Sequence, residues 1–284
     1  MTEALTRRAA AAGLAAGMAG PALAGDGPRR VVSLNPCLDA ILVQVADRAQ
    51  IAAVSHYSHD PQSSSSGALG LAFPFTYGSA EEVVALRPDL VLVTVFASSA
   101  TRTALARLGV PFQMFGLPNT VEESLDQVQQ VAAAVNRTAR GEALVARIRA
   151  AIARAAPPPG TPAPSALVFQ SGGLVYAPGT VMDDMLRRTG FTNAARRYGL
   201  TRSGNVPLER IIADPPDVLL AGQAAPGAPT WADRVLTHPA LARVAHRMHR
   251  AVFPQQLTYC GGPVLIETAK MLARARREAL EARA

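Results

Sequence analysis

The feature that most constrains this fold is a pattern that occurs twice: a short helix, a turn containing Pro-Asp, and an apolar strand. The first copy is Glu81–Val93 and the second is Glu209–Leu220. A strand with no polar face is buried on both sides, as in a parallel sheet covered by helices. One copy in each half of the chain therefore predicts two similar α/β lobes.

Apolar strands alternate with helices along most of the chain, and several helices start at recognisable signals such as Pro36 or Ser79. This alternation favours a mostly parallel sheet in each lobe. The predicted strands are 30–34, 51–54, 90–95, 110–115, 166–170, 218–220 and one within 246–253, and the predicted helices begin at 36, 79, 101, 121, 138, 181, 208 and 263.

Two long helices occupy the middle of the sequence. The first, 121–135, is followed by Asn136, which can end a helix in a left-handed conformation. The second, 138–156, is stopped by Pro157–Gly160. We therefore expect an N-terminal lobe at 25–136, a connecting helix at 137–156 and a C-terminal lobe at 157–284. Two Rossmann-like lobes joined by one helix place a ligand cleft between them, outside the strand ends.

The first 24 residues are typical of a signal peptide. Arg7 and Arg8 precede an uncharged run, and Ala22–Ala24 offers a small-residue cleavage site. The run is too short and too rich in glycine for a membrane-spanning helix. We expect the signal peptide to be removed and the protein to be periplasmic. The alternative is an Ala-rich helix of the folded protein.

Composition excludes several functions. The net charge is +7, but the arginines are scattered, and aromatic residues make up only 5% of the chain. We therefore expect no nucleic-acid partner. An enzyme would need Ser64 or Cys37 as its nucleophile, but the chain contains no G-x-S-x-G motif. The two cysteines, Cys37 and Cys260, form either a disulfide, which an oxidising compartment permits, or two separate thiols.

Several segments together carry a family resemblance. They are Val31–Pro36, Asp47–Ser55, Glu81–Val93, Glu209–Ala213 with Pro216-Asp217, and Gly261–Pro263. In this order they resemble the helical-backbone class (class III) of periplasmic substrate-binding proteins, which deliver cobalamin, ferric siderophores or heme to ABC importers. The resemblance implies a monomer that binds a small-molecule metal chelate, partners an ABC permease, catalyses no reaction and holds no cofactor or metal ion of its own.

The resemblance also assigns roles to two carboxylates. In this class each lobe offers a surface glutamate that docks on arginines of the membrane subunits. The matching positions are Glu81 and Glu209, and Glu82 competes for the first role. The alternative is that these carboxylates only stabilise the helix starts at which they lie.

The cleft should be lined by loops at the strand ends. These loops are 35–37, 55–60, 75–77 and 96–99 in the first lobe, and 170–174, 196–205 and 259–262 in the second. Cobalamin binders of this class place a ligand-contacting tyrosine where Tyr57 stands. Arginines in the second-lobe loop suit an anionic ligand, and tyrosines can stack on a ligand or, at Tyr259, ligate heme iron. The candidate ligand-binding residues are Tyr57, His56, Tyr77, Arg196, Arg197, Tyr198, Arg202 and Tyr259.

The ligand itself stays open at this point. Cobalamin sites in this class are rich in aromatic residues, and this chain has a single tryptophan, Trp231, so siderophores or other iron chelates come first. One alternative is a protein for free zinc or manganese ions, built from His56, His59, Asp60 and His238. Another is a stand-alone ligand sensor on the same fold.

Overall fold

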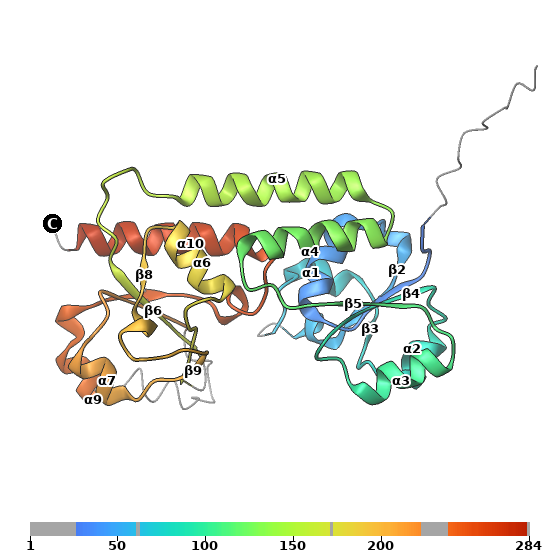
Figure 1. Cartoon of the computed structure of the whole chain (residues 1–284), viewed down its shortest axis with the longest axis horizontal. Helices are drawn as coiled ribbons and strands as arrows, with labels where there is room; N and C mark the ends of the chain where they lie inside the picture. The colour runs from blue at the N-terminus through green and yellow to red at the C-terminus, as the bar shows by residue number, and fades with distance from the viewer. Residues whose placement is uncertain (1–26, 61–62, 171–172, 223–237, 283–284) are drawn as a thin grey trace, which may run out of the picture.

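A computed structural model describes residues 27–60, 63–170, 173–222 and 238–282. The predicted signal peptide and Trp231 lie outside these ranges. Figure 1 shows two α/β halves side by side, with α5 (Thr138–Ala155) lying across both of them. We call the half with the first sheet the first lobe and the other half the second lobe. No helix in the described ranges is both long and apolar enough to cross a membrane.

The first lobe is built on a five-stranded sheet in the order β3-β2-β1-β4-β5, with every neighbouring pair parallel. Helices α1 and α4 cover one face, and α2 and α3 cover the other. The strands are β1 (Val31–Ser33), β2 (Ile51–Ser55), β3 (Phe75–Thr76), β4 (Leu90–Thr94) and β5 (Phe112–Phe115), and the helices are α1 (Pro36–Val45), α2 (Ala80–Ala85), α3 (Ser99–Arg107) and α4 (Val121–Ala134).

The second lobe has a six-stranded sheet in the order β11-β10-β6-β7-β9, with β8 paired to β6. β6, β8, β10 and β11 are parallel, whereas β7 runs antiparallel to both β6 and β9. The strands are β6 (Ser165–Phe169), β7 (Leu174–Val175), β8 (Thr192–Asn193), β9 (Gly204–Asn205), β10 (Val218–Ala221) and β11 (His249–Val252), and the helices are α6 (Val181–Arg188), α7 (Leu208–Ala213), α9 (Pro239–Arg243) and α10 (Val264–Glu281).

The duplicated pattern has the same structural role in both lobes. Its Pro-Asp turn joins α2 to β4 in the first lobe and α7 to β10 in the second. The Asp89 carboxylate accepts the backbone N–H of Arg30 at 2.9 Å, and the Asp217 carboxylate accepts that of Ser165 at 2.7 Å. Each aspartate thus holds the start of the neighbouring strand, β1 or β6, which explains why both copies carry Asp after Pro.

Local signals set the predicted helix ends. Ser79 caps α2, and its hydroxyl accepts the N–H of Glu82 at 3.2 Å. Thr180 caps α6 in the same way through the N–H of Asp183. Asn136 has the left-handed φ of 54° expected for a residue that ends α4. Residues next to these helices therefore determine where each helix begins or ends.

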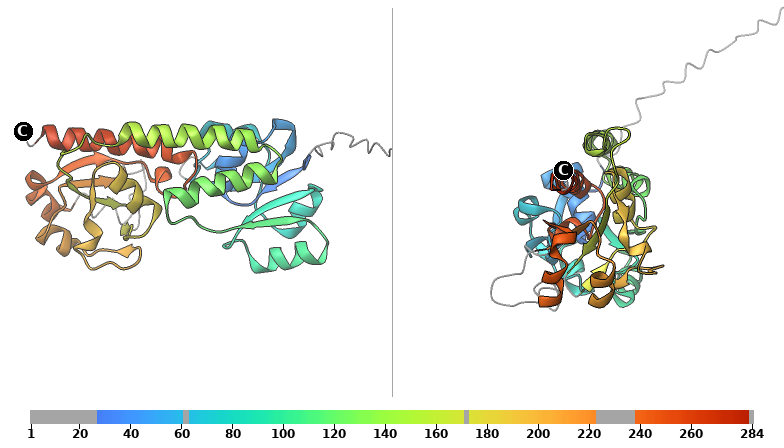
Figure 2. Two further views of the ribbon diagram at one scale, coloured as in Figure 1. Left: turned by 45° about the horizontal axis from the view of Figure 1, so that its top comes forward. Right: turned by 90° about the vertical axis from the view of Figure 1, so that its left-hand side faces the viewer.

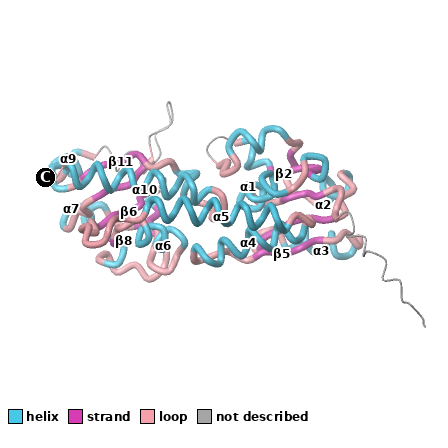
Figure 3. The backbone as a smooth tube through the Cα atoms, turned by 90° about the horizontal axis from the view of Figure 1, so that it is seen from above, coloured by secondary structure: helices cyan, strands magenta, loops and turns pink. Residues whose placement is uncertain are grey.

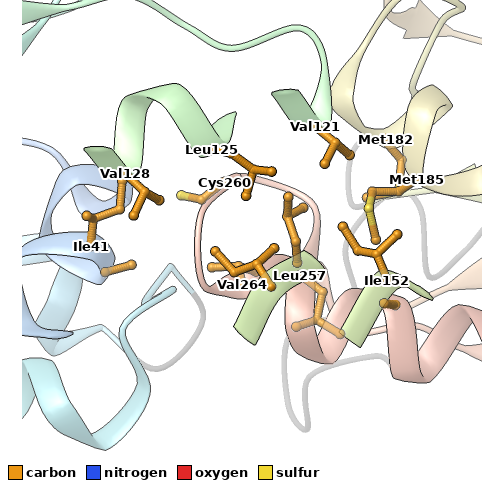
Figure 4. Packing of buried hydrophobic residues seen from close by; sticks show 14 of the residues in the cluster. Ile41, Val121, Leu125, Val128, Ile152, Met182, Met185, Leu257, Cys260 and Val264 are labelled. Atoms are coloured by element: carbon orange, nitrogen blue, oxygen red, sulfur yellow. The ribbon is translucent and has the colours of Figure 1, made fainter. Parts of the chain in front are cut away.

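The boundary between the lobes is a packed core. Figures 2 and 3 show α10 running alongside α5, and one apolar cluster continues from the first lobe into the second. Figure 4 shows Ile41 and Val128 of the first lobe on one side of this cluster and Met182 and Met185 of the second lobe on the other. Such a core resists large changes in the angle between the lobes.

Candidate functional site

Three of the pockets formed by described residues lie between the lobes, and two of them are adjacent and share Asn35, Thr94 and Tyr259 as lining residues. The larger has a volume of about 360 Å³ and the smaller about 210 Å³. In the first lobe they open at the carboxyl ends of β1, β4 and β5, where a parallel sheet presents its loops. In the second lobe their walls come from the start of α6 and from the segment before α10. We call the two pockets together the cleft.

The cleft walls are uncharged. No carboxylate, imidazole or basic side chain occurs among the described residues that line the two pockets. Aromatic rings are prominent instead: Tyr57 is 44% exposed, Phe96 72% and Tyr259 43%. Side-chain hydroxyl and amide groups provide the remaining polarity. Walls of this kind bind the apolar body of an organic ligand and orient it through a few hydrogen bonds.

The predicted first-lobe residues gather around one stack of rings. The His56 ring lies 4.0 Å from the Tyr57 ring and 4.9 Å from the Tyr77 ring, measured between centroids. Phe75 meets Tyr77 edge to face at 5.5 Å. Tyr57 lines the larger pocket, whereas His56, Phe75 and Tyr77 line neither pocket of the cleft.

The predicted second-lobe residues are dispersed. The Tyr198 side chain is buried and donates its hydroxyl to the backbone carbonyl of Asp214 at 2.7 Å. Burial raises its pKa to about 12. Arg197 is paired with the Asp214 carboxylate at 3.0 Å and also donates to Ser165, at the amino end of β6. Both side chains therefore have their partners within the second lobe, and neither lines a pocket of the cleft.

Two other arginines lie nearer to solvent. Arg196 is 3.7 Å from the Asp183 carboxylate and lines neither pocket. Arg202 is exposed and immediately precedes Ser203, which lines the smaller pocket. Arg202 is therefore the predicted arginine placed next to the cleft wall.

The structure joins Cys37 and Cys260 in a disulfide, with Cα atoms 5.1 Å apart. Cys37 lies in the first turn of α1 and Cys260 in the segment before α10, so the bond connects the two lobes at the cleft. Tyr259, the residue before Cys260, lines both pockets beside this bond. The sequence left the pairing open, because only coordinates supply the Cα separation.

Tyr259 is the predicted second-lobe residue that lines both pockets. Its hydroxyl accepts a hydrogen bond from the Gln255 side chain. Burial raises the pKa of Tyr259, and nearby Tyr176 and Asp60 add to this effect.

Further lining residues went unrecognised in the sequence. Most belong to the loop after β5 and to the start of α6: Gly116, Leu117, Pro118, Asn119, Thr180, Val181 and Met182. The others are dispersed along the chain: Leu34, Ser63, Thr94, Gln127, Tyr176, Thr258 and Leu265. The 116–119 loop follows a parallel strand, and this signal was available in the sequence. The turn of α6 reaches the cleft only because the lobes pack against each other.

A buried carboxylate beneath the cleft also escaped notice. Asp39 of α1 has no exposed surface, and burial raises its pKa to about 7, although the nearby hydroxyl groups of Ser33, Ser55 and Ser58 lower it. The sequence signal that could have identified this buried carboxylate is that Asp39 is an acidic residue within the apolar run Leu38–Leu42.

The two predicted docking carboxylates are exposed on α2 and α7. Neither Glu81 nor Glu209 forms a hydrogen bond or ion pair within the described part of the chain. Figure 1 shows α2 and α7 on the side of the molecule opposite α5, one in each lobe. Glu82 instead has partners within its own lobe. Its carboxylate accepts hydrogen bonds from the Thr76 hydroxyl at 2.7 Å and from the Tyr77 N–H at 2.8 Å.

The residues considered as ligands of a free metal ion do not form a shared metal site in the described part of the chain. The His56 ring stacks on Tyr57, and His59 Nε2 lies 2.9 Å from the Phe73 carbonyl. The described ranges contain no group of three or more His, Cys, Asp or Glu residues arranged to hold a metal. A first-row metal site needs three or four such ligands.

A family model described as "Periplasmic binding protein" matches residues 31–250. The chain belongs to this family. The match begins at β1 and ends within β11, so it includes both sheets and α5.

The chain is also similar to individual binding proteins, one by sequence and two by structure. A cobalamin-binding protein of Halobacterium salinarum is 27% identical over 203 residues, which is 70% of this chain and 55% of that protein, so the chain spans about half of that relative's length. The apo structure of the periplasmic heme-binding protein RhuT from Roseiflexus sp. RS-1 has a TM-score of 0.70 at 24% identity, covering 90% of this chain and 99% of that one. The vitamin B12 binding protein BtuF of Vibrio cholerae has a TM-score of 0.64 at 15% identity, covering 89% and 98%. The two structural likenesses establish the two-lobed fold.

Proposed function

We propose that this periplasmic binding protein captures an organic metal chelate in the cleft and delivers it to an ABC transporter. One observation carries the proposal: the cleft presents aromatic rings from both lobes and no carboxylate, imidazole or basic side chain among its described lining residues. A metal that arrives inside an organic chelator needs apolar contact and a few hydrogen bonds. A bare ion needs charged or imidazole ligands.

The ligand classes to be tested come from the cleft and from the relatives. An iron complex with a large organic shell, a ferric siderophore or heme, fits a cleft whose walls are rings and hydroxyls. Cobalamin belongs to the same group because the curated relative is named for it. Arg202, which is exposed and precedes the lining residue Ser203, is our candidate to meet a carboxylate or other anionic group of such a ligand.

We propose a separate role for each part of the chain. Residues 1–24 direct export to the periplasm, 25–136 and 157–284 form the walls of the cleft, and 137–156 connects them. The protein acts as a monomer and catalyses no reaction. Glu81 and Glu209 dock on the permease, one from each lobe, because both are exposed on the same side of the molecule.

A thermal-shift and titration panel on the purified protein tests the ligand class. The panel contains hemin, cyanocobalamin, a ferric hydroxamate, a ferric catecholate, ferric citrate and zinc chloride. A ligand at 100 times its Kd should add about 2.7 kcal/mol to the free energy of unfolding. Stabilisation by one chelate supports the proposal and names the ligand. Stabilisation by zinc alone would contradict it and restore the free-metal alternative.

A further inference from the structure

Asp39 lies inside the first lobe and gathers its hydrogen bonds on one oxygen. Its Oδ2 atom accepts from the backbone N–H of Ser55 at 3.0 Å, from the Ser55 hydroxyl at 2.5 Å and from the Ser58 hydroxyl at 2.7 Å. Oδ1 is buried without a partner. A fully buried carboxylate that is not paired with a cation is costly, so its presence in the core calls for a reason.

The three donors enclose a two-residue segment of the chain. Ser55 ends β2, and Ser58 lies in the 3₁₀ helix His56–His59 that follows it. His56 and Tyr57 stand between them; their rings lie against each other, and Tyr57 lines the larger pocket of the cleft. One oxygen of Asp39 therefore holds the chain on both sides of this pair.

The side chain of Tyr57 has little else to hold it. No hydrogen bond of its hydroxyl occurs among the described residues, and its ring is 44% exposed at the larger pocket. The direction of the ring is therefore set by the backbone of residues 55–58 and by the contact with His56. Movement of this backbone would displace the ring from the pocket wall.

We propose that Asp39 is a positioning residue: it fixes the His56–Tyr57 segment from beneath, so that the Tyr57 ring is preorganised to bind the ligand. The inference rests on the proposed function of the cleft. A ring already held in its bound position loses less conformational freedom on binding, and the affinity is higher by that amount.

Asp39 can exchange protons with solvent through hydroxyl groups. The Ser66 hydroxyl donates to that of Ser58 at 3.2 Å, and Ser64 and Ser66 are 3.2 Å apart. Ser58, Ser64 and Ser66 line a separate pocket of about 510 Å³ between the lobes, whose titratable lining residues are His59 and Glu267. The charge of Asp39 therefore follows solution pH, and its pKa of about 7 places the change near neutrality.

Ionisation of Asp39 should loosen its hold, because burial disfavours the carboxylate and opening of the 55–58 segment would hydrate it. Affinity for the chelate should consequently fall as the pH rises from 6 to 8. In Asp39→Asn, the amide oxygen can still accept the three hydrogen bonds but cannot ionise. This variant should retain binding and lose the dependence on pH.

Hydrogen–deuterium exchange provides a test that needs no ligand. Asp39→Ala should accelerate exchange in peptides that cover residues 55–58 and leave β6 unchanged. Ser58→Ala removes a single donor and serves if Asp39→Ala folds poorly. Asp184→Ala is the matched control, because it removes a buried carboxylate from the boundary between the lobes without touching this segment. Unchanged exchange at residues 55–58 in both Asp39→Ala and Ser58→Ala would overturn the inference.

Titrations with hemin, cyanocobalamin and a ferric hydroxamate complete the test. Asp39→Ala should raise the Kd of the chelate that binds by about tenfold, whereas Asp39→Asn should stay close to wild type at pH 6. Faster exchange at residues 55–58 without any loss of affinity would refute the positioning role. If no chelate binds the wild-type protein, the proposed function fails, and the exchange data alone decide whether Asp39 holds the segment.

Discussion

The Asp184 carboxylate accepts the backbone N–H of Val121 at 3.0 Å across the boundary between the lobes. Val121 is the first residue of α4 in the first lobe, and Asp184 belongs to α6 in the second. The other carboxylate oxygen accepts from Arg187 and Arg188. Burial alone would raise the pKa of Asp184, but the Val121 N–H and Arg188 hold it below its usual value. The side chain is thus a charged link between two helix starts.

Asp184→Ala should lower the free energy of unfolding by about 3 kcal/mol, because it breaks a buried charge network and leaves the Val121 N–H without its acceptor. Urea denaturation followed by circular dichroism measures this loss. Asp126→Ala, which removes an exposed carboxylate from α4, should change stability by less than about 0.5 kcal/mol. Equal losses in the two variants would show that the link contributes nothing specific.

The fold was largely predictable because its signals are local. Helix α6 runs from Val181 to Arg188, as predicted, since Thr180 caps its start and Gly190 follows its end with a φ of 83°. The strands β7 and β9 were not predictable. Each has two residues, too few to show an alternating pattern, and they form only by pairing across a long separation in the chain.

The disulfide between Cys37 and Cys260 spans 223 residues of sequence. Closing so long a loop restricts the unfolded chain and should add on the order of 4 kcal/mol to stability. The Cys37→Ser, Cys260→Ser double variant should therefore unfold at a lower urea concentration. A reducing agent should lower the midpoint of the wild-type protein to that of the variant. A further shift of the variant in reductant would mean that the reagent acts by another route.

Asp39 should give stability an unusual dependence on pH. Its pKa is about 7 in the folded protein and near 3.8 when unfolded, so the folded chain binds the extra proton between these values. Stability should therefore fall as the pH rises from about 4 to about 7, by up to about 4 kcal/mol, and then level off. Asp47 and Asp184, whose pKa values are lowered, act in the opposite direction and only at more acidic pH.

Urea denaturation of the wild type and Asp39→Asn at several pH values tests this prediction. The difference between their free energies of unfolding should change between pH 4 and 7 and stay constant between pH 7.5 and 9. Curves that run parallel across the acidic range would mean that Asp39 does not titrate there.

The site was only half predictable. Tyr57, predicted from the family resemblance, and Tyr259, predicted as an aromatic residue in a strand-end loop, both line the cleft. Arg197 and Tyr198 also lie in a predicted strand-end loop, but Asp214 binds both of them within the lobe. Sequence position identifies a loop, whereas the partner that a side chain selects depends on the folded surroundings. Asp39 was missed because its partners, Ser55 and Ser58, lie on a different element.

Removal of either cleft tyrosine should weaken binding of the chelate. Tyr57→Ala and Tyr259→Ala should each raise its Kd by about tenfold, since each removes a ring from one wall. Titration calorimetry measures both, and Leu69→Ala, which removes an exposed side chain that lines neither cleft pocket, should have no effect. If heme is the ligand, the spectrum of the heme complex of Tyr259→Phe separates the two possible roles of this ring, because an unchanged spectrum assigns it to stacking. A spectral change in that variant would instead assign Tyr259 as an iron ligand.

The carboxylates on α2 and α7 should act in delivery and not in capture. Charge reversal in Glu81→Arg with Glu209→Arg should reduce uptake of the chelate by cells at least tenfold, because like charges at a docking surface repel. The Kd measured on the purified variant should be that of the wild type, since neither residue lines the cleft pockets. Glu142→Arg is the matched control: it reverses an exposed charge on α5, on the opposite side of the molecule.

The combination of uptake and Kd separates the alternatives for Glu81 and Glu209. Reduced uptake with unchanged Kd places both residues at the transporter interface. Reduced uptake together with a raised Kd would mean that α2 and α7 influence the cleft, and the division between capture and delivery would be wrong. Unchanged uptake in the double variant would favour a sensor on the same fold, because a sensor has no permease to dock on and its helix-start carboxylates would act only on their own helices.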